Sequence, residues 1–154
     1  MMSKSASYAL HAALQMALAP DEPVTVATVA GRFGFPRTAL AKVFQQLVRA
    51  GLAQGTRGVG GGYRLARRAA DITVLDVLAV FETKPAEECC LEARMKVAPP
   101  HRAGCALRQL LDEADELLRC TYASVSLATL AKRAAGNGPR AADSSRPRVV
   151  RRPT

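Results

Sequence analysis

The segment TRGVGGGYRLARR, residues 56–68, combines two residue types suited to contact with an anion. Glycine lets the backbone approach a ligand closely, and arginine binds phosphate through several N–H donors. Nucleotides and the backbone of DNA are therefore the ligands to consider. A phosphate-binding P-loop is excluded, because Tyr63 and Arg64 follow the last glycine, where Lys and then Ser or Thr are required. The dinucleotide-binding pattern also fails, since Tyr63 occupies the position of its third glycine.

The four cysteines are the second group of residues with evident chemistry. Thiols of a cytosolic protein are more often reduced, metal-bound or redox-active than paired in structural disulfides. Cys89 and Cys90 lie in residues 83–104, which lack helical periodicity, and Cys105 follows this loop directly. Such long loops are usually functional or disordered. Cys120 falls near the apolar side of a predicted helix, so we expect it in the core.

Enzymatic chemistry is disfavoured. A cysteine nucleophile needs a histidine beside it, and nothing in the sequence predicts that His11 or His101 lies next to a cysteine. If residues 56–68 form a loop that contacts DNA, no other segment is left as a phosphate-binding or oxyanion-binding loop. We therefore expect a protein that is not an enzyme.

The net charge of +9 is distributed unevenly. Residues 23–70 carry eight basic side chains and no acidic one, residues 71–131 carry ten acidic and six basic ones, and residues 132–154 carry seven basic ones and one aspartate. Surfaces normally mix both signs, so a 48-residue segment without a carboxylate predicts a nucleic-acid partner and disfavours a purely structural adaptor. No apolar stretch approaches the roughly 20 residues of a membrane span, so we expect a cytoplasmic protein without a membrane partner.

Two short helices joined by a glycine-containing turn are predicted at about residues 25–49. Thr25 is a suitable N-cap, the first helix ends at Gly34, and the second spans residues 37–49. This is the helix-turn-helix arrangement, although an ordinary helical hairpin with a polar outer face has the same spacing. The second helix would present polar side chains to the major groove, and its predicted DNA contacts are Arg37, Thr38, Lys42 and Gln45.

A β-hairpin is predicted at about residues 52–66, since both flanks of the glycine-rich segment alternate like strands. Directly after a helix-turn-helix, such a hairpin is a wing. Its glycines would let the tip lie close to the sugar-phosphate backbone, and Arg57 or Arg64 could enter a narrow minor groove. The predicted wing contacts with DNA are Arg57, Gly60, Tyr63 and Arg64.

The C-terminal part predicts three further helices and a tail. Thr73 and Asp76 form a variant capping box at the start of one helix. A longer helix at about residues 106–122 carries an apolar side that would form a dimer, with packing inside one chain as the alternative, and a short helix covers residues 127–133. The fold class is thus mainly α with a small β-hairpin: a winged helix-turn-helix domain at 1–82, a cysteine-bearing loop at 83–104, a dimerisation region at 105–133 and a disordered basic tail at 134–154.

Three segments, SYALHAALQMALA, AGLAQGTRGVGGGYRLAR and ITVLDVLAVFE, together with the helix-turn-helix, resemble the Rrf-two family of bacterial winged-helix regulators. The most specific part is Arg57–Leu65, and the resemblance covers roughly residues 1–133. It implies a homodimeric transcription factor on double-stranded DNA, in the bacterial cytoplasm and associated with the nucleoid. Several members sense iron–sulfur status, nitric oxide or redox state through a cluster held in the loop before the dimerisation helix.

The resemblance implies Cys89, Cys90 and Cys105 as ligands of an iron–sulfur cluster. Cluster-binding relatives have three spaced cysteines here, whereas two are adjacent in this chain. Some relatives complete the site from the N-terminal helix of the partner subunit, the segment in which this chain has His11. His101 in the loop is the alternative ligand. Because imidazole can replace thiolate on one iron, a 2Fe-2S cluster is favoured over a 4Fe-4S cluster. The alternative is a cluster-free regulator switched by thiol oxidation or a small effector.

Overall fold

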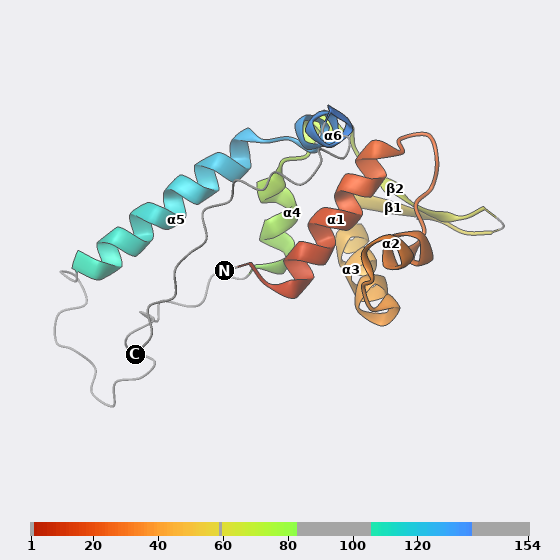
Figure 1. Cartoon of the computed structure of the whole chain (residues 1–154), viewed down its shortest axis with the longest axis horizontal. Coiled ribbons are helices and arrows are strands. Elements are labelled where there is room, and N and C mark those ends of the chain that lie inside the picture. The colour runs from red at the N-terminus through yellow and green to blue at the C-terminus, as the bar shows by residue number, and fades with distance from the viewer. Residues whose placement is uncertain (1, 59, 83–105, 137–154) are drawn as a thin grey trace, which may run out of the picture.

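The computed structural model describes residues 2–58, 60–82 and 106–136 of the 154-residue chain. The fold is mainly α-helical with one two-stranded antiparallel hairpin, as the sequence predicted. In chain order the elements are α1 Lys4–Leu18, α2 Val26–Phe33, α3 Arg37–Arg49, β1 Ala53–Thr56, β2 Gly62–Leu65, the short 3-10 helix η1 Ala69–Asp71, α4 Val74–Phe81, α5 Ala106–Ser124 and α6 Leu127–Gly136. Figure 1 labels the α-helices and strands.

Helix α1 is the central element, with α4 on one side and α2 and α3 on the other (Figure 1). Ala9, Ala12 and Ala13 on this helix are buried, and their small side chains let neighbouring helices approach closely. The core around them is filled by Phe44, Leu40, Leu47, Ile72 and Leu127, which are all fully buried. Burial of these side chains is the main force that holds the helix-turn-helix against the rest of the body.

Hydrogen bonds from side chains define the beginnings of the helices. The hydroxyl of Ser3 accepts from the N–H of Ala6 at 3.1 Å, and that of Thr25 accepts from the N–H of Thr28 at 3.0 Å. Thr73 and Asp76 form the predicted capping box, with each side chain accepting from the backbone N–H of the other residue at 3.1 and 2.9 Å. Such caps satisfy N–H groups that a helix leaves free at its first turn.

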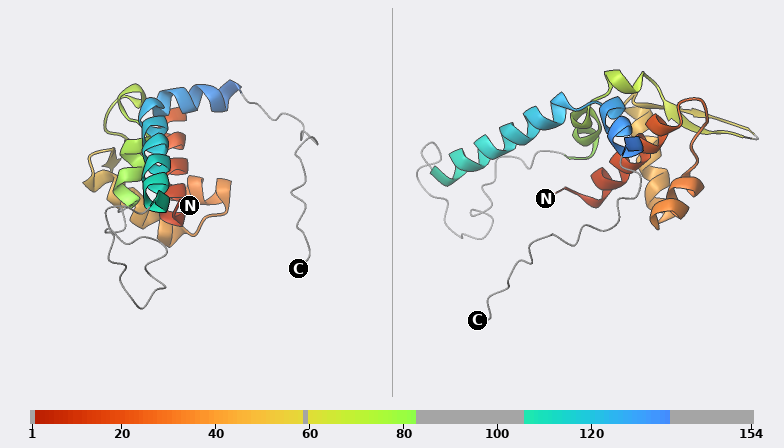
Figure 2. Two further views of the ribbon diagram at one scale, coloured as in Figure 1. Left: turned by 90° about the vertical axis from the view of Figure 1, so that its left-hand side faces the viewer. Right: turned by 45° about the horizontal axis from the view of Figure 1, so that its top comes forward.

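Helix α5 extends away from the body formed by α1–α4 (Figure 2). It ends at Ser124, two residues beyond the predicted end, and α6 continues to Gly136, so residues 134–136, expected in the tail, are helical. The cysteine loop at 83–104, Cys105 and residues 137–154 lie outside the described residues.

Candidate DNA-binding surface

Helix α3 separates its apolar and polar side chains cleanly. Leu40, Val43, Phe44 and Leu47 are buried, whereas the predicted contacts Arg37, Thr38, Lys42 and Gln45 are all exposed. A spacing of three or four residues places the exposed set on one side of the helix. The structure therefore presents two cations and two hydrogen-bonding side chains together on the outer side of α3.

The turn before α3 requires glycine at one position. Gly34 has φ +68°, a conformation that L side chains rarely adopt. Its N–H donates to the carbonyl of Ala30 at 2.9 Å, and the N–H of Phe35 donates to the same oxygen at 3.2 Å. After this turn α3 begins at Arg37, and its N-cap, Pro36, makes no side-chain capping hydrogen bond.

The glycines of the hairpin have two different roles. Gly58 and Gly60 have φ +106° and +81°, so they supply the left-handed backbone of the turn. Gly61 and Gly62 are required because other backbone atoms lie very close to them. A Cβ on Gly61 would lie 2.4 Å from the carbonyl oxygen of Thr56, and a Cβ on Gly62 would lie 2.9 Å from the carbonyl oxygen of Val24. We expected the glycines to allow approach to DNA, whereas two of them are needed for packing within the chain.

Tyr63 joins the hairpin to the helices. Its ring stacks on that of Phe44 from α3, with centroids 4.5 Å apart and 27° between the planes. Its backbone exchanges two hydrogen bonds with Val24, of 2.8 and 2.9 Å. The structure thus gives this half-buried residue a packing role, and its predicted contact with DNA stays a prediction. Arg64 is half-buried on β2, opposite Gln54 of β1, and Arg57 is exposed.

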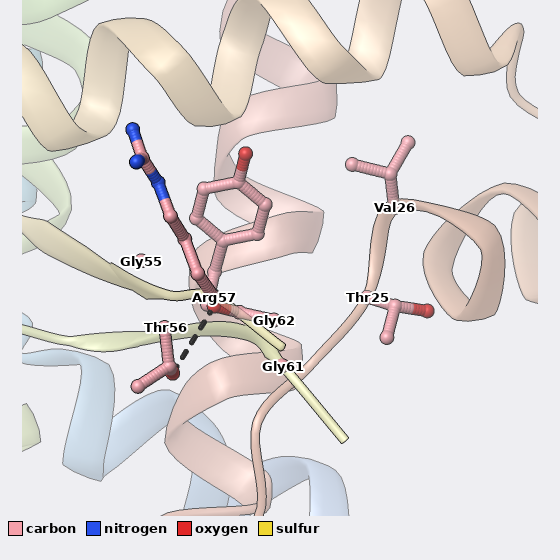
Figure 3. A pocket seen from close by; sticks show the side chains of 8 residues that line it. Thr25, Val26, Gly55, Thr56, Arg57, Gly61 and Gly62 are labelled. Atoms are coloured by element: carbon pink, nitrogen blue, oxygen red, sulfur yellow. Dashed lines mark hydrogen bonds between the residues drawn. The ribbon is translucent and has the colours of Figure 1, made fainter. Parts of the chain in front are cut away.

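An open hollow of about 390 Å³ lies between the hairpin and the start of α2. Figure 3 shows Gly55, Arg57 and Gly62 on the hairpin side and Thr25 and Val26 on the other. Arg57 lines the hollow, which adjoins the N-terminus of α2, and a cation and a helix N-terminus both favour a phosphate group. Thr25 was predicted only as a helix cap, because its position across the hollow from Arg57 depends on the tertiary structure.

Replacing Arg57 by alanine should weaken DNA binding without lowering stability, because this exposed side chain has no core contact to lose. Loss of one phosphate contact would lower the salt slope by about 1, and loss of a base contact would cost roughly 1–3 kcal/mol on the specific site. Gel-shift titrations at several salt concentrations measure both. Arg133→Ala removes the same charge from an exposed position near the end of α6 and is the control. Equal affinities of Arg57→Ala and the parent would contradict the wing assignment.

His11 is the predicted metal ligand that the structure describes. Its Nδ1 lies 2.8 Å from the carbonyl oxygen of Ser7, and its half-buried ring packs edge-to-face against Phe33 and Phe35. A carbonyl can only accept, so Nδ1 donates in this hydrogen bond and Nε2 keeps its lone pair in the neutral ring. The other predicted ligands, Cys89, Cys90, Cys105 and His101, lie outside the described residues. Among the residues that are described, no three His, Cys, Asp or Glu side chains group as a metal site.

The expectation that Cys120 lies in the core was wrong. Cys120 is exposed on α5, and its thiol lies 3.7 Å from the carboxylate of Glu116. The apolar side of α5 is not buried either: Leu110, Leu111, Leu117 and Leu118 are exposed to 60%, 43%, 71% and 50% in the single chain. We call these four residues the leucine face of α5. Within the described part of the chain, packing inside one subunit does not cover it.

The family model Rrf2, described as "Iron-dependent Transcriptional regulator", matches residues 2–133. The chain belongs to the Rrf2 (Rrf-two) family. It is 35% identical over 131 residues to BadM of Rhodopseudomonas palustris, named as an HTH-type transcriptional regulator, covering 85% of this chain and 81% of that protein. It is 39% identical over 90 residues to the HTH-type transcriptional regulator IscR of Photobacterium profundum, covering 57% of this chain and 52% of that relative.

Solved structures share the winged-helix fold of this Rrf2 protein. An IscR structure from T. potens superposes with a TM-score of 0.72 at 24% identity, covering 92% of this chain and 93% of that one. CymR, the global cysteine regulator of B. subtilis, superposes with a TM-score of 0.71 at 23% identity, covering 86% and 97%.

The family assignment confirms that this Rrf2 protein is a transcriptional regulator and not an enzyme. It also identifies the helix-turn-helix and hairpin as parts of a DNA-binding regulator rather than an ordinary helical hairpin. In the described residues, no helix is both long enough and apolar enough to cross a membrane.

Proposed function

We propose that the protein is a cytoplasmic, homodimeric regulator that binds specific sites on double-stranded DNA. The observation that carries the proposal is the juxtaposition of the exposed side of α3 with the hairpin in a segment without a carboxylate, residues 23–70. The proposed contacts are Arg37, Thr38, Lys42 and Gln45 of α3 and Arg57, Gly60, Tyr63 and Arg64 of the wing.

Helix α3 enters the major groove in this proposal, with its N-terminal end first. Arg37 and Lys42 can bind phosphates or guanine, and Gln45 can form two hydrogen bonds with adenine. Arg57 at the wing then reaches the neighbouring backbone or minor groove. Contacts to bases select the sequence, whereas contacts to phosphates position the protein.

A second subunit covers the leucine face of α5 in this proposal. Four large apolar side chains that are 43–71% exposed on one helix form a patch of the kind that marks a protein interface. A symmetric dimer would place two α3 helices on half-sites about 34 Å apart, one turn of DNA.

We propose that the cysteine loop, residues 83–104, and the adjoining Cys105 bind an iron–sulfur cluster. Cys89, Cys90 and Cys105 would supply thiolates, and His11 of the partner subunit, or His101, would supply imidazole. The hydrogen bond from Nδ1 of His11 to the Ser7 carbonyl supports the fit, because metal-binding histidines usually donate their other ring N–H to such an acceptor. A mixed thiolate and imidazole set suits a 2Fe-2S cluster, which when bound would supply one-electron redox chemistry sensitive to oxidants or nitric oxide.

The alternative is a cluster-free regulator switched by oxidation of its thiols or by a small effector. The adjacent pair Cys89 and Cys90 favours it, since spaced cysteines are typical of cluster-binding relatives. The fold is also shared with a CymR from Staphylococcus aureus that was solved in an oxidized form.

Selection from random double-stranded DNA with the purified protein tests the DNA-binding proposal. We expect enrichment of a symmetric site with half-sites one turn apart and an affinity that falls steeply with salt. Failure to enrich any sequence would contradict sequence-specific binding.

Cys105→Ala should abolish iron binding, because it removes a thiolate ligand next to the dimerisation helix. The measurement is visible absorption and iron content after anaerobic expression and reconstitution. Cys120→Ala is the matched control, since it removes an exposed thiol of α5 outside the loop and should leave the iron content unchanged. A parent without iron, or a Cys105→Ala variant with full iron content, would exclude the cluster and favour the thiol switch.

A further inference from the structure

Four half-buried aromatic side chains meet where α1 packs against the helix-turn-helix, and we call them the aromatic cluster: Tyr8, His11, Phe33 and Phe35. The ring centroids of His11 and Phe33 are 4.7 Å apart, and those of His11 and Phe35 are 5.3 Å apart, both edge-to-face. Phe33 and Phe35 stack at 5.4 Å, and Tyr8 lies 4.4 Å from Phe35. His11 therefore contacts both phenylalanines that flank the turn residue Gly34.

The aromatic cluster packs around the turn that precedes α3, the helix proposed to enter the major groove. Phe33 is the last residue of α2, and Phe35 stands two residues before Arg37, the first residue of α3. Since Pro36 makes no side-chain capping hydrogen bond, the start of α3 lacks the side-chain anchor that Thr25 gives α2. The position of Arg37 and Thr38 then depends on how the rings on either side of Gly34 are packed.

The ring of His11 is itself held in one orientation. Its Nδ1 donates to the Ser7 carbonyl one turn earlier in α1, at 2.8 Å. Edge-to-face contacts between aromatic rings have a preferred geometry and are worth roughly 0.5–1.5 kcal/mol beyond their buried area. A change in the orientation of this ring would therefore alter its edge-to-face contacts with Phe33 and Phe35.

We infer that His11 acts through Phe33 and Phe35 to position the N-terminal end of α3, so that the packing of one side chain on α1 sets the affinity for the specific DNA site. The inference rests on the proposed function, because it assumes that the start of α3 contacts bases. It assigns His11 a role that exists without any metal.

The test uses metal-free, full-length protein, prepared with a chelator, and a DNA site selected by the parent from random sequence. His11→Ala should weaken binding to this site by roughly tenfold, the scale of one lost base contact. It should leave binding to unrelated DNA of the same length unchanged, since every cation is still present. His11→Phe restores an aromatic ring without a ligand atom and should bind the selected site within about twofold of the parent.

Leu10→Ala is the matched control, because Leu10 is also a half-buried residue of α1 and packs on both hydrophobic clusters, but it has no ring and takes no part in the aromatic cluster. It should lower the melting temperature while DNA affinity stays at the parent's value. If His11→Ala does not fold, Phe35→Leu tests the same contact from the other side and should show the same loss of specific binding.

Three outcomes would overturn the inference: parent-like specific affinity in both His11→Ala and Phe35→Leu, no rescue in His11→Phe, or an equal loss in Leu10→Ala. Failure of the proposed function is distinguished from these, because the parent itself would then select no DNA site.

Discussion

Replacing Leu110 and Leu117 together by glutamate should convert the proposed dimer into monomers and weaken binding to the full DNA site by roughly 100-fold or more, the usual scale of lost bivalency. Both side chains are well exposed in the single chain, 60% and 71%, so the subunit should fold normally. In a dimer each would bury apolar surface worth roughly 1.5–3 kcal/mol, and two buried glutamates per subunit would reverse that gain.

Light scattering after gel filtration measures the mass, and gel-shift titration measures the affinity. The control is Gln109→Glu with Ala123→Glu, which adds the same two charges at exposed positions on the other side of α5. These residues lie about half a turn away from the leucine face. A dimer that persists with both leucines replaced would show that another surface joins the subunits.

Phe44→Ala should lower the free energy of unfolding by about 3–5 kcal/mol, as truncation of a buried phenylalanine usually does. Phe44 is fully buried on α3 and supports the ring of Tyr63 at 4.5 Å. The variant therefore loses core contacts and the attachment of the wing at once. A loss of this size is a large part of the roughly 5–15 kcal/mol that stabilises a typical domain, so specific DNA binding should fall with it.

Urea unfolding followed by circular dichroism measures the change. Tyr63→Phe keeps the stacked ring and should stay within about 1 kcal/mol of the parent, and Val48→Ala on the exposed side of α3 should do the same. A loss below about 1 kcal/mol in Phe44→Ala would show that the wing and α3 are not held together through this contact.

The helix-turn-helix was predictable because its signals are local. Thr25 and Gly34 define the ends of α2, and the apolar spacing in residues 37–49 predicts which side of α3 is buried. Each of these signals acts within one or two helical turns, so it can be recognised without knowing which distant residues it will contact. The capping box of Thr73 and Asp76 was found for the same reason.

Contacts between distant residues were not predictable. Tyr63 stacks on Phe44, and Val24 pairs with the backbone of Tyr63 across almost 40 positions of sequence. The family resemblance implied His11 as a ligand, whereas its contacts with Phe33 and Phe35 depend on how α1 crosses the turn. Hydrophobic periodicity predicts that a side is buried but does not identify its partner.

Residue type, spacing and caps act locally, and they predicted the basic segment without carboxylates, the helix-turn-helix, the wing and the family. The folded structure was needed to explain why Gly61 and Gly62 must be glycine. It was also needed to find that the described residues of one subunit leave the leucine face of α5 uncovered, and that His11 packs against the turn before α3. Those features depend on distances between segments far apart in the chain, which are set by packing of the whole core rather than by any local pattern.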